Sequence, residues 1–465
     1  MKNDNPNNLM EKITSLAKRR GFLFQSSEIY GGINACYDYG PLGVELKNNV
    51  KKAWWDYMVR DRSDIEGIDA SILMHPKVWE ASGHLKHFTD PLVDCKKCKK
   101  RFKEEDILES AEKKVVSAKG GSAYGGKGAL KCPECGGELT EARNFNLMFK
   151  THMGPVESKG NEIYLRPETA QGIYVNFKNV LDSTGQKVPF GIAQIGKAFR
   201  NEITPGNLTF RLREFEQMEM QYFVNPKKAT KYFDYWLKER KNWYLEYGLT
   251  RGKIKVQEHQ EGELAHYAKK AVDIQYEFPF GFKELEGIHN RTDYDLIEHE
   301  EASGKDLNYI DQVTNEKFIP WIVETSGGID RAALAFLIDA YTEVKGGRSE
   351  KGQTAHETEV VLKLDKRLAP IKVAVLPLSR KEELTKEAIK IFDLIKKDFK
   401  TKYDETGSIG KRYRRQDEIG TPYCVTIDFE TLKDKAVTVR DRDTMEQERV
   451  KVKELKDYLG GKLNS

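Results

Sequence analysis

The stretch from Phe199 to Phe223, FRNEITPGNLTFRLREFEQMEMQYF, restricts the fold most, because it predicts two strands joined by a loop. The turn-forming residues at positions 204–207, Thr-Pro-Gly-Asn, mark the loop. Alternate side chains of a strand share a face, so Arg211, Phe215 and Glu219 are expected on one face of the second strand. The residues expected between them on that face are Arg213, Gln217 and Gln221.

The two faces of this predicted hairpin differ in chemistry. The opposite face carries apolar residues typical of a core, interrupted by two acids: Phe210, Leu212, Glu214, Glu216, Met218, Met220 and Tyr222. On the first strand, Arg200 and Glu202 are two apart and are expected to share the charged face. Arginine suits phosphate oxygens, an aromatic ring suits a planar base, and a carboxylate suits an amine. The charged face therefore predicts a pocket for an aminated planar base, its phosphates and an amine. An amphipathic hairpin with a solvated charged face is the alternative.

Two Cys-x-x-Cys pairs, Cys95 with Cys98 and Cys132 with Cys135, predict a tetrahedral structural zinc site. Paired disulfides are the alternative, and they are rare in cytoplasmic proteins. The glycine-rich part of the spacer, residues 120–126, is expected to be mobile. A basic run at residues 96–103 predicts either a solvated face or a contact with the acceptor end of an RNA. The remaining cysteines, Cys36 and Cys424, are expected to be buried thiols.

The order Phe-Arg-x-Glu, loop, Arg-x3-Phe-x3-Glu in residues 199–219 resembles the second signature motif of class II aminoacyl-tRNA synthetases. The sequence around it is similar to that of the bacterial, homodimeric glycyl-tRNA synthetases, and the similarity covers nearly the whole chain. Residues 37–60 resemble the first signature motif, a helix at a dimer interface, and residues 164–172 resemble the family's RPETAQG segment. Residues 320–331 match the third motif, with Asp330 where a glutamate is common in the class.

The resemblance implies an α+β fold: an antiparallel catalytic sheet flanked by helices, a zinc-ribbon-like insertion and a C-terminal α/β anticodon-binding domain. Alternating strands and helices after residue 366 independently predict a small α/β domain with a mixed sheet. The expected divisions are 1–90, 144–224 and 282–345 for the three parts of the catalytic domain, 91–143 for the zinc insertion, 225–281 for a second insertion, 346–365 for a linker and 366–465 for the anticodon-binding domain.

By the resemblance, the protein activates glycine with ATP and Mg²⁺ and transfers it to tRNA(Gly), with Arg200 and Arg331 as catalytic residues. The implied ATP contacts are Arg200, Asn201, Glu202, Phe210, Arg211, Leu212, Arg213, Glu214, Phe215, Glu284, Leu285, Gly328, Ile329, Asp330 and Arg331. The implied glycine contacts are Arg101, Glu168, Phe215, Glu216, Gln217, Met218, Glu219, Arg291, Glu324, Thr325, Ser326, Gly327 and Gly328.

Several of these residues have plainer interpretations. Glu168 would otherwise be an acid in the first turn of a helix that Thr169 caps. Strand alternation places Glu284 and Glu286 on one face, which suits Mg²⁺ carrying nucleotide phosphates, or else forms an exposed acidic edge. The helix expected over residues 44–60 is otherwise a plain amphipathic surface helix.

Charge and composition restrict the binding partners and the cellular compartment that we expect for this protein. No apolar run approaches the roughly 18 residues of a membrane span, and the first residues lack a signal-peptide core, so a cytoplasmic protein with no membrane contact is expected. From Lys366 onward there are 24 Lys and Arg against 18 Asp and Glu, which hints at a polyanion partner. The loop expected at residues 411–417 mixes arginines with an aromatic and suits RNA. Its candidate tRNA contacts are Arg412, Arg414 and Arg415.

Three rival functions remain open on the sequence alone. A catalytically silent relative would be expected to lose the phosphate-binding arginines, yet Arg200, Arg211 and Arg331 are all present. A synthetase for another small amino acid would differ in the amino-acid pocket. A zinc-ribbon nucleic-acid binder would leave most of the chain unexplained.

Overall fold

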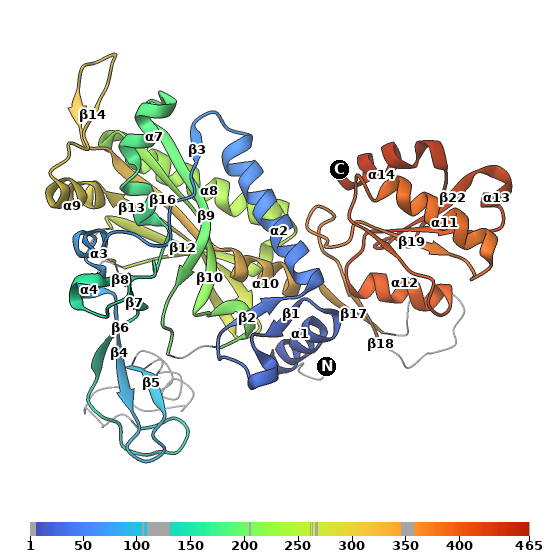
Figure 1. Ribbon diagram of the computed structural model, residues 1–465, viewed down its shortest axis with the longest axis horizontal. Coiled ribbons are helices and arrows are strands. Elements are labelled where there is room, and N and C mark those ends of the chain that lie inside the picture. The colour runs from blue at the N-terminus through green and yellow to red at the C-terminus, as the bar shows by residue number, and fades with distance from the viewer. Residues whose placement is uncertain are drawn as a thin grey trace.

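The computed structural model describes residues 6–104, 107–108, 131–203, 206–260, 262, 264–265, 268–345 and 358–464 (Figure 1). Two sheets organise it: a seven-stranded sheet in the first three quarters of the chain and a five-stranded sheet at the C-terminal end. The short pair β17 (Tyr341–Lys345) and β18 (Thr358–Leu362) lies where one part passes into the other. The glycine-rich spacer, Thr204, Pro205 and residues 346–357 of the expected linker lie outside the described residues.

The larger sheet has the order β11-β12-β13-β16-β10-β9-β3. All its pairings are antiparallel except that of β3 with β9. Its strands are β3 (Ile65–Gly67), β9 (Phe190–Phe199), β10 (Glu214–Val224), β11 (Ile254–Glu258), β12 (Lys270–Phe278), β13 (Gly281–Thr292) and β16 (Trp321–Gly328). The strand of this sheet that comes last in the chain, β16, lies between β13 and β10, in the middle of the sheet.

The predicted hairpin is present as β9 and β10, but its strands end earlier than the sequence pattern indicated. The last pair of the ladder joins Phe199 with Glu214. Arg200 and Glu202 therefore lie beyond β9, and Arg211 lies in the connection before β10, where a 3₁₀ turn spans Leu208–Phe210. The expectation that Arg200 and Glu202 share a strand face was wrong, because a long connection rather than a tight turn joins the strands.

The alternation predicted for the second strand is confirmed within β10. Met218, Met220 and Tyr222 are buried in the main core, whereas Gln217, Glu219 and Gln221 lie on the other face, which we call the front face. Three helices cover the core face: α2 (Pro41–Trp55), α8 (Ala229–Glu246) and α10 (Ile329–Ala340). The predicted helix at residues 44–60 is α2, continued by a π-helical turn at Asp56–Arg60.

Residues 225–281 differ from the insertion expected there. They supply α8, whose Phe233, Trp236 and Trp243 are fully buried in the main core, and the two sheet strands β11 and β12. The segment is thus part of the sheet and its packing. The polar, aromatic composition that suggested an insertion reflects a helix that buries large rings on one side only.

The front face is covered along only part of its length. A second apolar cluster joins Phe190, Phe223 and Ile322 of the sheet to helices α6 (Ala170–Tyr174), α7 (Phe177–Thr184) and α9 (Tyr294–Ser303). Short helices α3 (Pro76–Ala81) and α4 (His84–His87) follow the sheet's first strand in the chain. Beyond this cluster the front face is polar, and there the candidate site lies.

Several small strand pairs complete the N-terminal part, together with helix α1 (Pro6–Arg20). The cysteine-containing module is a three-stranded sheet of β4 (Thr89–Asp94), β5 (Arg101–Lys103) and β6 (Arg143–Asn146), projecting from the body in Figure 1. The two-stranded pairs are β1 (Leu23–Gln25) with β2 (Tyr37–Tyr39), β7 (Lys150–His152) with β8 (Glu162–Tyr164), and β14 (Tyr309–Ile310) with β15 (Lys317–Phe318).

The C-terminal part is the predicted α/β domain with a mixed sheet, in the order β20-β19-β21-β22-β23. Its strands are β19 (Val373–Pro377), β20 (Thr401–Tyr403), β21 (Tyr423–Ile427), β22 (Ala436–Asp441) and β23 (Gln447–Lys451). Its helices are α11 (Glu382–Ile395), α12 (Ile409–Glu418), α13 (Thr431–Asp434) and α14 (Leu455–Asn464). Residues 411–417, expected as a loop, belong to α12, because Arg412 and Gln416, one turn apart, are both buried on its inner side.

A buried ion pair lies beneath the sheet, next to an irregularity in β13. The register with β12 passes from Ile274 opposite Glu286 to Gln275 opposite Glu284, which leaves Leu285 without a partner. Glu286 consequently faces the core, where it accepts hydrogen bonds from Arg240 at 2.7 and 3.1 Å and from Tyr244 at 2.7 Å. The prediction that Glu284 and Glu286 share one face of the strand was therefore wrong.

Replacing Arg240 by methionine is expected to lower the free energy of unfolding by about 3–5 kcal/mol, because Glu286 would stay buried without its ionic partner. Urea unfolding followed by tryptophan fluorescence measures the N-terminal part, since all six tryptophans lie between residues 54 and 321. The variant Arg240→Met/Glu286→Leu, which removes both charges, is expected to recover most of the loss. The exposed Lys238 of the same helix gives the matched control Lys238→Met. Equal stability of Arg240→Met and parent would show that the pair does not stabilise the fold.

Candidate functional site

A cavity of about 420 Å³ opens on the polar part of the front face. Strands β10, β13 and β16 form its floor, and the connection before β10, the start of α10 and the cysteine-containing module form its walls. It brings together most of the residues singled out in the sequence: Glu168, Arg200, Glu202, Phe210, Arg211, Leu212, Phe215, Gln217, Glu219, Glu284, Arg291, Glu324, Ser326, Gly327, Gly328, Asp330 and Arg331.

Three carboxylates gather at one end of the cavity, which we call the acidic end: Glu168, Glu219 and Glu324. Glu219 faces Ser326 across the β10–β16 ladder, and Glu324 faces Gln221. Gln221 Nε2 donates to Glu219 Oε1 at 3.1 Å and to Glu324 Oε2 at 2.7 Å. Because one amide holds an oxygen of each acid, the two carboxylates are fixed relative to each other.

The three acids have different protonation preferences. Burial and the charges of Glu324 and Glu168 raise the pKa of Glu219 well above its usual value. Burial also opposes ionisation of Glu168, but the charges of His84 and Arg291 lower its pKa to about 2. Arg291 and His289 likewise hold the pKa of Glu324 below its usual range, against the effect of burial. An added cation at this end would favour ionisation of Glu219.

A hydrogen-bond network behind the acidic end keeps its charged groups in place. Arg291 binds Asp295 of α9 through two hydrogen bonds, at 2.8 and 3.0 Å, and Glu324 Oε2 at 3.1 Å. Gln171 donates to Asp295 at 3.0 Å and to Glu168 at 3.2 Å. The network makes the acidic end a rigid site, because all of its members except Glu168 sit on helices or strands, and Glu168 lies just before α6.

Two histidines at the acidic end were not singled out in the sequence. His84 Nε2 lies 3.3 Å from Glu168, and His289 Nδ1 lies 2.8 Å from Glu324. His289 could have been found, because it is two residues before Arg291 on one strand and alternation puts both on one face. No signal marked His84, whose contact with Glu168 depends on how α4 packs.

The other end of the cavity combines cations with rings. The guanidinium of Arg200 lies 5.3 Å from the ring centroids of both Phe88 and Phe215. Arg331 lies 4.4 Å from the ring centroid of Phe210 and donates to the backbone oxygen of Glu284 at 2.9 Å and to its carboxylate at 3.0 Å. Positive charge beside flat rings suits a phosphorylated planar base. We call this the basic end.

Other residues singled out in the sequence do not line the cavity. Glu216, Met218 and Thr325 alternate with the front-face residues and so point away from it, and Leu285 and Ile329 are fully buried in the core. Glu214 pairs with Lys197, Arg213 binds the backbone oxygens of Glu202 and Asn34, and Asn201 is absent from the lining. Glu216 instead pairs with Lys47 and Lys51 of α2.

Thr169 stands at the N-cap position of α6, as expected, but its side chain makes no capping hydrogen bond. Its hydroxyl donates to Glu219 Oε2, and its backbone N–H donates to Gln217 Oε1 at 3.1 Å. Gln217 Nε2 in turn donates to Ser326 Oγ at 3.2 Å. These bonds join three segments into one wall beside the acids.

The cysteine-containing module reaches the cavity through a different residue from the one expected. Arg101 is exposed and binds Asp94 of the neighbouring strand at 2.7 Å. Lys103, two residues later on β5, lines the cavity, pairs with Asp90 and lies 3.5 Å from Glu202. Arg101 thus lies outside the lining of the cavity in this structure, because it stands at the projecting end of β5, and its contact with the substrate stays a prediction.

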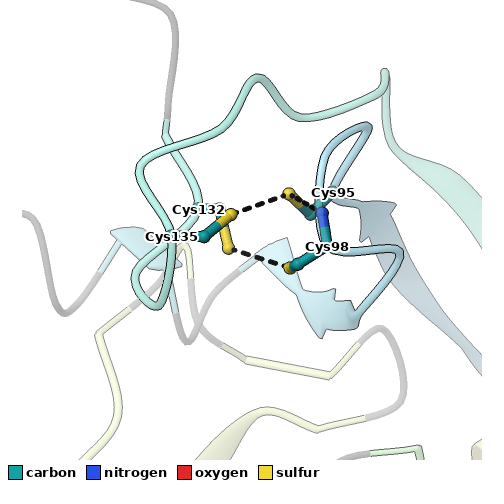
Figure 2. A group of neighbouring side chains, drawn as sticks. All are labelled: Cys95, Cys98, Cys132 and Cys135. Carbon is teal, nitrogen blue, oxygen red and sulfur yellow. Dashed lines mark hydrogen bonds between the residues drawn. The ribbon is translucent and has the colours of Figure 1, made fainter.

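The four cysteines of the two Cys-x-x-Cys pairs converge in this module, and Figure 2 shows their sulfur atoms facing one another. All four sulfurs lie within 4.8 Å of one another, and the closest contacts are 3.5 Å for Cys95–Cys135 and 3.7 Å for Cys98–Cys132. Ligands about 2.3 Å from one tetrahedral centre would be spaced about 3.8 Å apart. The set therefore fits a zinc ion.

The three arginines expected at the tRNA differ in availability. Arg412 is buried, and its guanidinium donates to the backbone oxygens of Pro377 and Gly407, so the structure uses it for packing and the expectation for it was wrong. Arg414 pairs with Glu359 at 2.9 Å, and Arg415 pairs with Asp404 at 2.6 Å. Both remain partly exposed.

No helix within the described residues has the length and apolar character needed to cross a membrane. A further cavity, about 260 Å³, lies beside the start of β10 and shares Leu212, Phe215 and Asp330 with the first.

Comparison with known proteins agrees with the two-part architecture. The family model described as "Anticodon binding domain" matches residues 372–462, which hold the five-stranded sheet. A glycine–tRNA ligase of Treponema denticola is 57% identical over 96% of this chain and 95% of its own length. Glycine–tRNA ligases of Alkaliphilus oremlandii and Clostridium acetobutylicum are 53% and 54% identical, with 98% of each chain covered. The chain therefore belongs to the glycine–tRNA ligase family.

Proposed function

We propose that this protein joins glycine to tRNA(Gly) in two steps, with the cavity on the front face as the class II active site. One observation carries the assignment: the cavity sets three carboxylates at one end and two ring-stacked arginines at the other. The acidic end suits the ammonium group of glycine, and the basic end suits ATP.

In the first step, a carboxylate oxygen of glycine attacks the α-phosphorus of ATP, the bond from that phosphorus to the bridging oxygen breaks, and pyrophosphate leaves. Arg200 would stabilise charge on the α-phosphate, and Arg211 and Arg331 would hold the β- and γ-phosphates. Phe215 would stack on adenine and Glu202 would accept from its amine. No side chain acts as a nucleophile, so catalysis consists of positioning and charge neutralisation.

In the second step, a ribose hydroxyl at the 3′ end of the tRNA attacks the carbonyl carbon of glycyl adenylate and AMP leaves. The basic C-terminal domain, matched by the anticodon-binding family model, would hold the other end of the same tRNA. Arg414 and Arg415 are the candidate contacts there, since both are partly exposed.

Two metals are part of the proposal. Mg²⁺ would be held by ATP phosphates and by Glu284 alone, because Glu286 lies on the core side; one carboxylate plus phosphates is a common magnesium set. Mg²⁺ would neutralise phosphate charge during transfer. Zinc, held by Cys95, Cys98, Cys132 and Cys135, would be structural, since four protein ligands leave no open position.

We also infer a cytoplasmic homodimer. Apolar side chains in the connection between β1 and β2, which precedes α2 in the chain, support an interface there: Ile29 and Tyr30 are 88% and 87% exposed, and Ile33 is 52% exposed. A tRNA substrate and a zinc site built from four thiols both suit the reducing cytoplasm.

The function is tested by glycine-dependent exchange of pyrophosphate into ATP, followed by charging of tRNA(Gly). Exchange is expected with glycine and to be far weaker with alanine or serine, because Gln217 and Ser326 close the wall beside the acids. Stronger exchange with another standard amino acid would contradict glycine as the substrate. Exchange with glycine but no charging would contradict the transfer step.

Glu219→Gln is expected to raise the apparent KM for glycine about tenfold or more and to leave that for ATP within about twofold, because only the ammonium loses a charged partner.

The same variant tests the raised pKa of Glu219. Because the pKa of this acid is higher in the folded state, the fold is most stable below the unfolded pKa of Glu219, and it loses stability as pH rises through the folded pKa. Glu219→Gln should therefore unfold at a higher temperature than the parent at pH 8, by a larger margin than at pH 5.

The matched control for Glu219→Gln is Glu258→Gln on the edge strand β11, an exposed acid outside the cavity. Equal weakening of glycine and ATP by Glu219→Gln would place this carboxylate in the nucleotide site instead.

Protein purified without chelator is expected to contain one zinc per chain, and Cys132→Ser should lose most of it, because three thiolates bind zinc less tightly than four. Inductively coupled plasma mass spectrometry measures the metal. Cys36→Ser, which changes a cysteine outside the cluster, is the control. Parent protein free of zinc, or Cys132→Ser with its zinc unchanged, would remove the assignment.

A further inference from the structure

A buried ionic network joins helix α2 to the basic end of the cavity. Lys47 of α2 has a side chain that is only 12% exposed. Its Nζ lies 2.7 Å from Asp330 Oδ1 and 2.8 Å from Glu216 Oε2. It also lies 4.4 Å from the ring centroid of Tyr39. One ammonium therefore pairs with two carboxylates that come from different parts of the sheet's packing.

Asp330 connects this network to the segments that carry Phe215 and Arg331. Its Oδ2 accepts the backbone N–H of Glu216 at 2.7 Å, one residue after Phe215. Its Oδ1 accepts the hydroxyl of Tyr39 at 2.6 Å, and its backbone oxygen accepts the hydroxyl of Thr209 at 3.3 Å. Because Asp330 immediately precedes Arg331, a shift of this carboxylate would move both the ring and the guanidinium.

The charges in the network balance only while Lys47 is present. Asp330 and Glu216 have side chains that are 4% and 14% exposed, so water screens their repulsion weakly. Lys51 offsets part of the charge through Glu216 Oε1 at 2.7 Å, but its side chain is 32% exposed. Burial works against the ammonium of Lys47, yet Asp330 and Glu216 together raise its pKa above the usual value. Lys47 is therefore charged at neutral pH.

We propose that Lys47 is a positioning residue for the nucleotide, which holds Phe215 and Arg331 in place by neutralising Glu216 and Asp330 together. Lys47 lines no part of the main cavity and has no direct contact with the proposed ATP site. The inference rests on the proposed function, since it assigns the basic end to ATP.

A second possibility is that Lys47 only packs and stabilises the junction of α2 with α10. The two possibilities differ in what repairs its loss. If Lys47 acts by separating two repelling carboxylates, then removing one of those charges should restore the site. If it acts by packing alone, removing a charge from Glu216 should not help.

The experiment uses the full-length protein and glycine-dependent pyrophosphate exchange. Lys47→Met keeps the side-chain length and removes the charge. Its turnover is expected to fall, and its apparent KM for ATP to rise, by about tenfold or more, because displaced groups lose catalytic power steeply with distance. The KM for glycine should stay within about twofold, since the acidic end is held by its own network of Gln221, Gln171 and Asp295.

Three further variants test the mechanism. Lys47→Met/Glu216→Gln is expected to recover activity to within about threefold of the parent, because one repelling carboxylate is gone. Lys52→Met, an exposed lysine on the same helix, is the matched control and should behave as the parent. Tyr39→Phe, which removes only the hydroxyl bound to Asp330, should raise the KM for ATP in the same direction as Lys47→Met, and it serves where Lys47→Met does not fold.

Three outcomes would overturn the inference: an ATP KM and turnover of Lys47→Met within twofold of the parent, no recovery in Lys47→Met/Glu216→Gln, or a Tyr39→Phe variant with unchanged kinetics. A parent protein without glycine-dependent exchange would instead contradict the proposed function. The two failures are therefore distinguishable.

Discussion

Alternation along β10 and β16 is the constraint on which the rest of the molecule depends. Each strand sends one set of side chains into the main core and the other set to the front face. On β10 the front set runs from Phe215 through Glu219 to Phe223, so the face changes from polar to apolar along one strand. Helices α6, α7 and α9 cover the apolar stretch. The polar stretch stays open, so a ligand can reach its acidic side chains from solvent.

The acidic end is costly for the fold and useful for binding. The buried Glu219 and Glu324 and the half-buried Glu168 repel one another, and the structure offsets this with Arg291, with His84 and His289, and with a raised pKa at Glu219. A ligand that brings an ammonium supplies the cation that is missing. Affinity for an amine and the reduced stability of the empty site thus have the same electrostatic origin.

The sequence was sufficient to predict the hairpin, the alternation along β10, the helix α2, the mixed C-terminal sheet and the convergence of Cys95 with its three partners. These features depend on local periodicity or on a fixed ligand spacing. It was insufficient where one residue changes the register: the extra residue at Leu285 turns Glu286 into the core, and no local pattern announces a bulge. Lys103 was missed because it reaches the cavity from the cysteine-containing module, and Phe88 because it reaches the cavity from the end of α4; both depend on tertiary packing.

The place of β16 in the sheet has a consequence for synthesis on the ribosome. Six of the seven strands are complete once residue 292 has emerged, but β13 and β10 cannot be joined until residues 321–328 follow. Until then the nascent chain exposes two strand edges, which are sites for chaperone binding or for wrong pairing with other chains. Glu324 and Ser326 arrive on that same strand, so the acidic end of the cavity is completed by the step that also closes the sheet.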